Sequence, residues 1–212
     1  MRREAPHRSA RLPGLRPGED SRVFPLRRRT FLLPATVLVA IAALAGPAAA
    51  QTLMTQEEAL ALAFPGDTVV ERRTAYLSPA QLDRARELAG AAVDIEQTIV
   101  TYYVGRRNGT FAGAAYFDVH RVRTKNEVVM VVVDPDHTLR RMEVLKFTEP
   151  PEYRAPDAWI QQLEGRPLDD ALSVRGGIRS IAGATLTARA MTEAARRVLA
   201  LHAVIEPFGG TP

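Results

Sequence analysis

The order of apolar and polar residues after position 50 predicts a series of strands and helices. Five segments are expected to be strands, at 68–76, 98–105, 111–122, 127–133 and 138–147. Asn108-Gly109 predicts a tight hairpin turn, so the middle of the chain is expected to form an antiparallel sheet. The segment 127–133, Glu-Val-Val-Met-Val-Val-Val, is apolar on both faces and predicts a central strand covered on both sides.

Four helices are predicted around these strands, at 55–63, 78–90, 157–163 and 186–205. The first opens with Thr55 and Glu58 at capping-box spacing, and the second opens with Ser78 before a proline. The last is the longest, and its apolar stripe consists of Thr187, Met191, Ala194, Val198, Leu201 and Ile205. We therefore predict an α+β fold, an antiparallel β-meander sheet flanked by helices, with a long C-terminal helix.

The basic character of the chain lies in its first 50 residues. The whole chain carries a formal charge of +4 and a sequence pI near 9.8, a balance that suggests nucleic acid or an anionic membrane surface. Residues 1–50 hold nine arginines and three acids, which leaves 19 basic and 21 acidic residues and a net charge of −2. We therefore expect no nucleic-acid partner.

The same 50 residues have the order of an export signal. Arg27–Arg29 precede an apolar run at 31–45, and Ala48-Ala49-Ala50 fits the small-residue pattern of a cleavage site. We predict a cleaved signal at 1–50 and a periplasmic or otherwise extracytoplasmic protein, soluble or membrane-associated. An uncleaved anchor is the alternative, because residues 31–50 provide the roughly 20 positions that span a bilayer.

The chain has no cysteine, which excludes a lipoprotein anchor, disulfides, thiolate metal sites and cysteine catalysis. No pair of histidines has metal-ligand spacing, and no serine has a histidine and an aspartate at suggestive spacing, so we predict neither a metal site nor catalytic residues. The part after residue 50 is long enough for one domain with its own core, ending in a loose tail at 207–212.

Small residues gather where the longest predicted helix begins, in the segment Ile-Ala-Gly-Ala-Thr-Leu-Thr at 181–187. A helix N-terminus offers unpaired backbone N–H groups and partial positive charge, so it holds a phosphate without a lysine. Gly183 and Ala184 would let such a group approach the backbone, and the hydroxyl of Thr185 could carry the phosphate as an ester. Alternatively, Thr185 is an ordinary N-cap, although Ala188 stands where a capping box needs Glu or Gln.

This segment resembles the attachment motif of the FMN-binding domain found in the covalent-flavin subunits of the Rnf complex and of the sodium-pumping NADH:quinone oxidoreductase. The family pattern is Asp-x-x-Ser/Thr-Gly-Ala-Thr, in which the threonine carries FMN through a phosphoester. Residues 183–185 match it, while Ala182 replaces the usual Ser or Thr and Arg179 replaces Asp. The order of the meander, the turn at 149–153 and the short helix at 157–163 also agrees, over roughly residues 95–205.

The resemblance implies FMN bound covalently to Thr185, with Thr187 as the second choice of acceptor. The cofactor-binding residues that it implies are Thr185, Gly183, Ala184, Ala182, Leu186, Thr187 and Glu149. Glu149 is included because the corresponding turn lies near the flavin in this family; a solvated loop acid is the alternative. Tyr102, Tyr103, Phe111 and Trp159 could line the flavin ring, but aromatic residues in strands more often pack in the core.

The predicted organisation is an export signal at 1–50, a helix-strand-helix segment at 51–94 that is part of the same domain, and the FMN-binding domain at 95–206. We hypothesise an exported electron-transfer flavoprotein rather than a free-standing enzyme. Its partners would be an exported flavin transferase that attaches FMN and a membrane redox complex or cytochrome. The alternative is a cofactor-free exported binding module of the same fold, in which Arg179 and Ala182 mark a decayed site.

Overall fold

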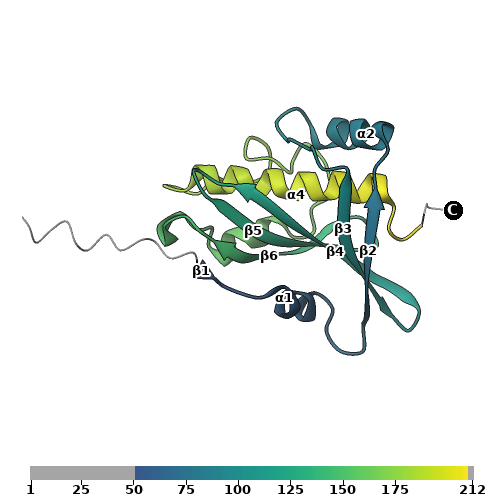
Figure 1. Cartoon of the computed structure of the whole chain (residues 1–212). Coiled ribbons are helices and arrows are strands. Elements are labelled where there is room, and N and C mark those ends of the chain that lie inside the picture. The colour runs from purple at the N-terminus through teal and green to yellow at the C-terminus, as the bar shows by residue number, and fades with distance from the viewer. Residues whose placement is uncertain (1–50, 210–212) are drawn as a thin grey trace, which may run out of the picture. The chain divides into compact units, whose positions relative to one another are not determined.

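The computed structural model describes residues 51–209, so the predicted export signal at 1–50 lies outside the described residues (Figure 1). Six strands form one antiparallel sheet in the order β1-β6-β5-β4-β3-β2. They are β1 (Gln51–Thr52), β2 (Val69–Tyr76), β3 (Ile99–Arg107), β4 (Thr110–Arg121), β5 (Asn126–Val133) and β6 (Leu139–Phe147). The five predicted strands are confirmed, and only β1, whose two residues carry no periodicity, was not predicted.

Four α-helices accompany the sheet, and all four were predicted from the sequence. They are α1 (Gln56–Ala63), α2 (Pro79–Ala89), α3 (Asp157–Ile160) and α4 (Thr185–Ile205), with short 3₁₀ turns at Pro151–Tyr153 and Gln161–Leu163. The predicted helix at 157–163 is therefore α-helical in its first half and 3₁₀ in its second half. The fold is α+β, as predicted, and among residues 51–209 no helix is long and apolar enough to cross a membrane.

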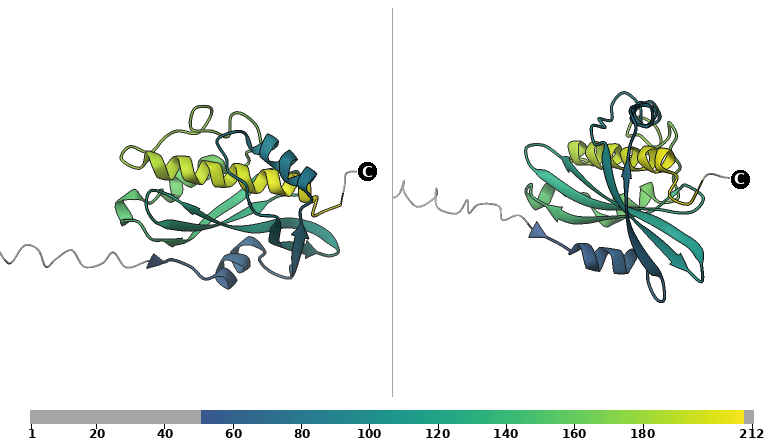
Figure 2. Two further views of the ribbon diagram at one scale, coloured as in Figure 1. Left: turned by 45° about the horizontal axis from the view of Figure 1, so that its top comes forward. Right: turned by 45° about the vertical axis from the view of Figure 1, so that its right-hand side comes forward.

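The helices cover the two faces of the sheet unequally. Figure 2 shows α4 lying along one face, with α2 beyond it, and the short α1 on the opposite face. The main core lies between the sheet and α4, and a smaller core lies beneath α1. In β5, Val129 and Val131 belong to the main core and Met130 and Val132 to the smaller one, all fully buried. The prediction of a central strand covered on both faces is confirmed.

The sheet forks between β3 and β4. Their ladder of paired residues ends at Tyr102 and Tyr116, although β3 extends back to Ile99 and β4 continues to Arg121. Beyond this point β3 pairs only with β2, and β4 pairs only with β5. The two pairs of strands therefore diverge, as Figure 1 shows, and the edges that face each other have no strand between them.

Candidate functional site

The loop before α4 is fixed by the short helical segment at 157–163. The indole N–H of Trp159 donates to the carbonyl oxygen of Arg179 at 2.5 Å, and the backbone N–H of Arg179 donates to Oε1 of Gln162 at 3.2 Å. Trp159 is buried in the main core. Its contact with Arg179 therefore fixes the beginning of the loop to the interior of the domain. The side chain of Arg179 is exposed.

The glycine of the motif is required by backbone conformation. Gly183 has a φ of +79°, which strains any residue with a Cβ, and nothing lies within 4 Å of the place where a Cβ would be. The structure therefore gives a second reason for this glycine, besides the close approach that the sequence suggested. The space on the outer side of Gly183 is open.

Helix α4 begins at Thr185 and has no side-chain cap. The residue at the N-cap position is Ala184, which is buried and offers no side-chain acceptor. Thr185 is the first helical residue and not the cap, so the interpretation of this hydroxyl as an ordinary N-cap is wrong. The backbone N–H groups of the first turn consequently have no side-chain partner at the cap, which leaves donors available for an anion.

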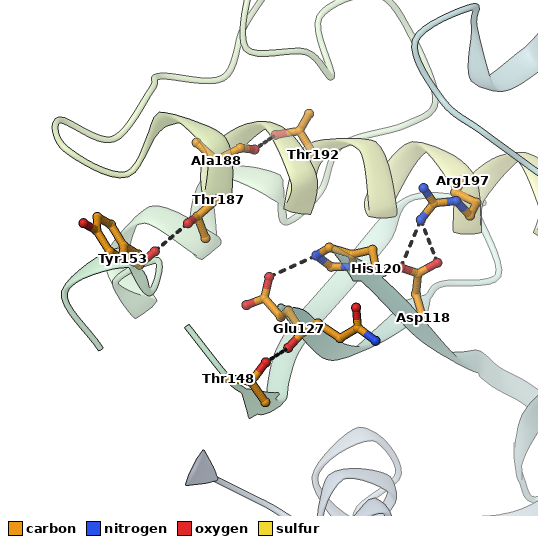
Figure 3. Close-up of polar contacts among 10 residues, drawn as sticks. Asp118, His120, Glu127, Thr148, Tyr153, Thr187, Ala188, Thr192 and Arg197 are labelled. Atoms are coloured by element: carbon orange, nitrogen blue, oxygen red, sulfur yellow. Dashed lines mark hydrogen bonds and ion pairs between the residues drawn. The ribbon is translucent and has the colours of Figure 1, made fainter. Parts of the chain in front are cut away.

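The two threonines of the motif have different environments. Thr185 is exposed; its Oγ1 accepts from Oγ of Ser180 and donates to the carbonyl oxygen of Ile181, both at 3.3 Å. Thr187 is only 1% exposed, and its Oγ1 donates to the carbonyl oxygen of Tyr153 at 2.5 Å (Figure 3). The hydroxyl of Thr185 is weakly held and accessible, whereas that of Thr187 is buried and committed.

A pocket of about 370 Å³ lies over the start of α4. Its lining consists of Gly183, Ala184, Thr185, Leu186, Thr187, Arg123 and Tyr153. Five of the seven predicted site residues therefore lie together, while Ala182 is exposed beside them. The guanidinium of Arg123 sits 4.3 Å from the centre of the Tyr153 ring. The sequence did not single out Arg123 or Tyr153, because each lies in a turn far from the motif and nothing local links them to it.

Glu149 supports the pocket from outside. It is 7% exposed and accepts three hydrogen bonds from the turn after β4: from the backbone N–H of Thr124 at 2.6 Å, its Oγ1 at 3.1 Å, and the backbone N–H of Lys125 at 2.9 Å. Burial raises the pKa of Glu149, but these hydrogen bonds and the charge of Arg123 outweigh it and lower the pKa. Glu149 is thus no solvated loop acid; it fixes the turn that carries Arg123.

The other aromatic candidates do not line this pocket. Tyr102 is buried and stacks on Tyr116 at 5.7 Å between ring centres, and Phe111 packs against Phe208 at 4.9 Å. Trp159 is a core residue, as described above. Tyr103 lines the cavity at the fork of the sheet, and Phe111 lines a separate cavity of about 530 Å³.

The fork between β3 and β4 opens into a cavity of about 790 Å³. Asp118, His120 and Arg197 line one wall of this cavity. They belong to a chain of charged groups that passes from α4 to the sheet (Figure 3). Arg197 donates to both carboxylate oxygens of Asp118 at 2.9 and 3.0 Å. His120 contacts Asp118 through Nδ1 at 2.9 Å and Glu127 through Nε2 at 3.0 Å. We call these four residues the charged chain.

The charged chain keeps His120 protonated. Burial lowers the pKa of His120, but the hydrogen bonds to Asp118 and Glu127 and their charges outweigh it and raise the pKa from 6.5 to about 9. Glu127 is fully buried, and its Oε1 has no hydrogen-bond partner among residues 51–209. The sequence did not predict this cluster, since Arg197 is 79 positions from Asp118.

The other two histidines of residues 51–209, the buried His202 and the exposed His137, form a separate contact. Nδ1 of His202 lies 3.0 Å from the hydroxyl of Tyr116, and its Nε2 lies 3.1 Å from Nδ1 of His137. Burial, with a smaller contribution from His137, lowers the pKa of His202 to about 3, so this residue is a neutral member of the core. Within the described part of the chain, no group of three or more His, Cys, Asp or Glu is placed to hold a metal ion.

Comparison with known proteins bears directly on the pocket over α4. Residues 125–200 match a family model described as FMN-binding domain. This range contains Glu149, Tyr153 and the whole segment 182–187, and it begins two residues after Arg123. No curated protein and no solved structure matches the sequence.

Proposed function

Residues 125–200 belong to the FMN-binding domain family, and on that premise we propose that this chain is an exported electron-transfer flavoprotein whose FMN is ester-linked through its phosphate to Thr185. The observation that carries the proposal is the exposed, weakly held hydroxyl of Thr185 at the uncapped start of α4. Flavin binding follows from the family; the covalent bond, export and the partner are parts of our proposal.

The residues around Thr185 suit a phosphate group. Three features support this: backbone N–H groups without a side-chain cap, open space beside Gly183, and the cation of Arg123 in the same lining. A phosphodiester keeps one negative charge, which the helix N-terminus and Arg123 would both stabilise. We therefore assign Arg123 the role of holding the phosphate, and Glu149 the role of positioning Arg123.

Attachment requires a second protein and a flavin donor, for which FAD is the natural source. The Oγ1–phosphorus bond forms at the riboflavin-side phosphate, the bridging phosphate bond of FAD breaks, and AMP leaves. The hydroxyl proton passes to a base of the transferase. The bound isoalloxazine ring would then accept and donate one or two electrons. A covalent bond is advantageous outside the cytoplasm, because a dissociated flavin could not be replaced there.

Arg179 is the position that most affects recognition by the transferase. Its backbone is held by Trp159 and Gln162, while its side chain is exposed and available to a second protein. Because the related motif has Asp there, we expect the Arg179→Asp variant to be flavinylated more completely than the natural chain. The second candidate function is the cofactor-free binding module. It is favoured by the two residues that differ from the family attachment motif, Arg179 and Ala182.

The proposed partners and location follow from the same reasoning. An export signal at 1–50 would deliver the chain to the periplasm or another extracytoplasmic site. There the flavin would exchange electrons with a membrane redox complex or a cytochrome. This role is that of an electron-transfer protein or subunit and requires no catalytic residue of its own.

The test is intact-protein mass spectrometry of the full chain after co-expression with a flavin transferase and export. The wild type should gain one FMN minus water, and so should Thr187→Val, which removes the buried hydroxyl but keeps the shape. Thr185→Ala should gain nothing. If Thr185→Ala is modified and Thr187→Val is not, Thr187 is the acceptor.

Arg179→Asp separates two reasons for an unmodified wild type. If the wild type stays unmodified but Arg179→Asp gains the flavin, the site is intact and only its recognition has been lost. If neither chain gains mass, the cofactor-free binding module is the correct function.

A further inference from the structure

We propose that the corner of the sheet between β1 and the β4–β5 turn is a docking surface for an anionic phospholipid membrane. A cavity of about 590 Å³ lies at this corner, lined by the strands β4, β5 and β6 and by the turn. Five residues of its lining, which we call the basic surface, carry the charge and the apolar contact: Val119, Arg121, Lys125, Val128 and Lys146.

The basic surface follows a row of paired residues across four strands. Val119 of β4 pairs with Val128 of β5, and Val128 pairs with Lys146 of β6. Lys146 in turn pairs with Thr52 of β1. Directly paired residues lie on the same face of a sheet, so these four side chains share one face. Because Val128 packs against the smaller core beneath α1, this is the face on which α1 lies (Figure 2).

The cations of the basic surface carry charge that no neighbour neutralises. Arg121, Lys125 and Lys146 are exposed, and none of them forms an ion pair within residues 51–209. Among the described residues, no carboxylate lines this cavity. The chain after residue 50 has a net charge of −2, so the positive charge here is a local feature. It is complementary to the headgroups of anionic lipids.

The acidic residues of this region are engaged or lie in another cavity. Glu149 accepts hydrogen bonds from the β4–β5 turn, and Glu143 of β6 pairs with Arg141. The exposed acids Asp94 and Glu96 line the neighbouring fork, and that lining includes neither of the two lysines of the basic surface. The lysines therefore keep their charge for a partner.

Val119 supplies an apolar contact among these cations. It is 62% exposed, whereas its pairing partner Val128 is partly buried. One exposed valine is ordinary by itself, but this one lies in the same lining as Arg121 and Lys146. A membrane interface binds a protein through both kinds of group, since headgroups attract cations and the acyl boundary takes up apolar side chains. A soluble anion would use only the charges.

The described chain begins in the same row. Strand β1 starts at Gln51, and its second residue, Thr52, is the pairing partner of Lys146. The segment 31–50, predicted to be an export signal or, if uncleaved, a membrane anchor, is therefore joined to the domain beside the basic surface. An anchor attached at this edge of the sheet would bring the same cations to the bilayer.

The β4–β5 turn connects the basic surface to the flavin pocket. Lys125 belongs to the basic surface, and Arg123, two positions earlier, lines the pocket at Thr185. Resting on the proposed function, docking would hold the attached flavin close to the bilayer, where the membrane redox partner lies. The docking itself requires neither flavin nor partner.

A single fluorescent label on the full, flavin-free chain tests the docking surface. The chain has no cysteine, so Val119→Cys gives one attachment point for an environment-sensitive dye. Vesicles of phosphatidylglycerol and phosphatidylcholine should shift its emission to the blue, and vesicles of phosphatidylcholine alone should not. The matched control is Val69→Cys, a similarly exposed strand valine outside the basic surface, whose dye should not respond. An equal response in both vesicles, or at both positions, would contradict the proposal.

Removing the charges tests their part in docking. The labelled Val119→Cys chain also receives Arg121→Gln, Lys125→Gln and Lys146→Gln. Each cation near an anionic surface strengthens binding roughly fivefold, so the lipid concentration that gives half of the response should rise roughly a hundredfold. An unchanged lipid requirement would show that these three cations do not contact the membrane.

A second triple variant changes the net charge equally at other places. Arg84→Gln, Arg175→Gln and Arg189→Gln remove exposed arginines on α2, in the loop before α4 and on α4. All three lie outside the basic surface, so the labelled chain should respond to anionic vesicles as before. If both triple variants lose the response alike, net charge decides the binding and the basic surface is not the docking site.

These measurements are independent of flavin attachment, so the two proposals fail separately. If the dye responds as expected and no ester forms at Thr185, the docking surface stands and the proposed function is wrong. If the ester forms and the dye at position 119 is silent, the docking surface is wrong. If the dye responds to soluble polyglutamate and not to vesicles, the basic surface binds an acidic polypeptide and the membrane proposal is overturned.

Discussion

Helices α2 and α4 pack against each other, yet they begin in opposite ways. At the start of α2, the backbone N–H of Gln81 donates to Oγ of Ser78 at 3.2 Å, and Gln81 Oε1 accepts the backbone N–H of Ser78 at 3.0 Å. Helix α1 has the same reciprocal cap, from Thr55 and Glu58. Helix α4 is the longest of the four and has only Ala184 at the corresponding position.

The two kinds of helix start serve different purposes: a capped start stabilises the helix, and an uncapped start leaves groups available for a ligand. A capped helix start satisfies some of its own donors, so it contributes to stability and has fewer donors left for a ligand. The open start of α4 loses that contribution and leaves its donors beside the accessible hydroxyl of Thr185. Helix α4 is instead fixed to the sheet farther along, where Arg197 meets the buried carboxylate of Asp118.

The largest effect is expected where α4 meets the sheet. Asp118→Ala leaves Arg197 and His120 buried without their shared partner, and we expect it to lower the free energy of unfolding by about 3 kcal/mol or more. Urea denaturation of the flavin-free chain measures this. The control is Glu71→Ala, whose ion pair with Arg73 is largely exposed and should contribute less than about 1 kcal/mol. Equal losses in the two variants would show that the buried contact does not anchor α4.

The same anchor makes stability depend on pH, which the neutral cap of α2 does not. Burial lowers the folded pKa of His120, but Asp118 on β4 and Glu127 on β5 face it and outweigh burial, so this pKa is about 9, above its ordinary 6.5. The stabilisation is therefore fully present below pH 6.5 and is lost as pH rises to about 9, by an amount on the order of 3 kcal/mol.

Denaturation at a series of pH values, with His120→Gln beside wild type, measures this effect. Between pH 6.5 and 9 the wild type should lose stability steadily, while the variant should stay level. Asp118 has a lowered pKa, so its own contribution is lost only at acidic pH and does not mask the change. A wild type whose stability is flat over this range would contradict the protonated state of His120.

Removing the cap of α2 should have a smaller effect. Ser78→Ala deletes the acceptor for the N–H of Gln81 and should cost about 1 kcal/mol, measured by urea denaturation. Flavin attachment at Thr185 should be unchanged, because the two helix starts serve different purposes. A loss of attachment in Ser78→Ala would show that the start of α2 supports the site.

The smallest stability change, and the sharpest test of the comparison, is to give α4 a cap. Ala184→Ser places a hydroxyl at the N-cap and should stabilise the flavin-free chain by roughly 0.5 kcal/mol. The same hydroxyl would occupy first-turn donors needed by the phosphate, so the fraction of chains carrying flavin should fall. Denaturation and intact mass are measured on the same samples. A more stable variant with full attachment would show that these donors do not bind the phosphate.

Much of this arrangement was already determined by the sequence. The period of apolar residues specified five strands and four helices, because burial on one face of a strand or helix repeats within a short window. The capping boxes at Thr55 and Ser78 and the hairpin at Asn108-Gly109 depend on neighbouring residues alone. The motif at 183–187 is also contiguous, so its place at the start of α4 was predictable.

The tertiary structure alone decided which distant residues surround these elements. Arg123 and Tyr153 reach the pocket at Thr185 because two turns far apart in sequence meet there. The charged chain depends on the pairing of β4 with β5 and on the position of α4 across the sheet. The fork depends on where the β3–β4 ladder ends. Such contacts are set by packing between elements, and no short window of sequence encodes them.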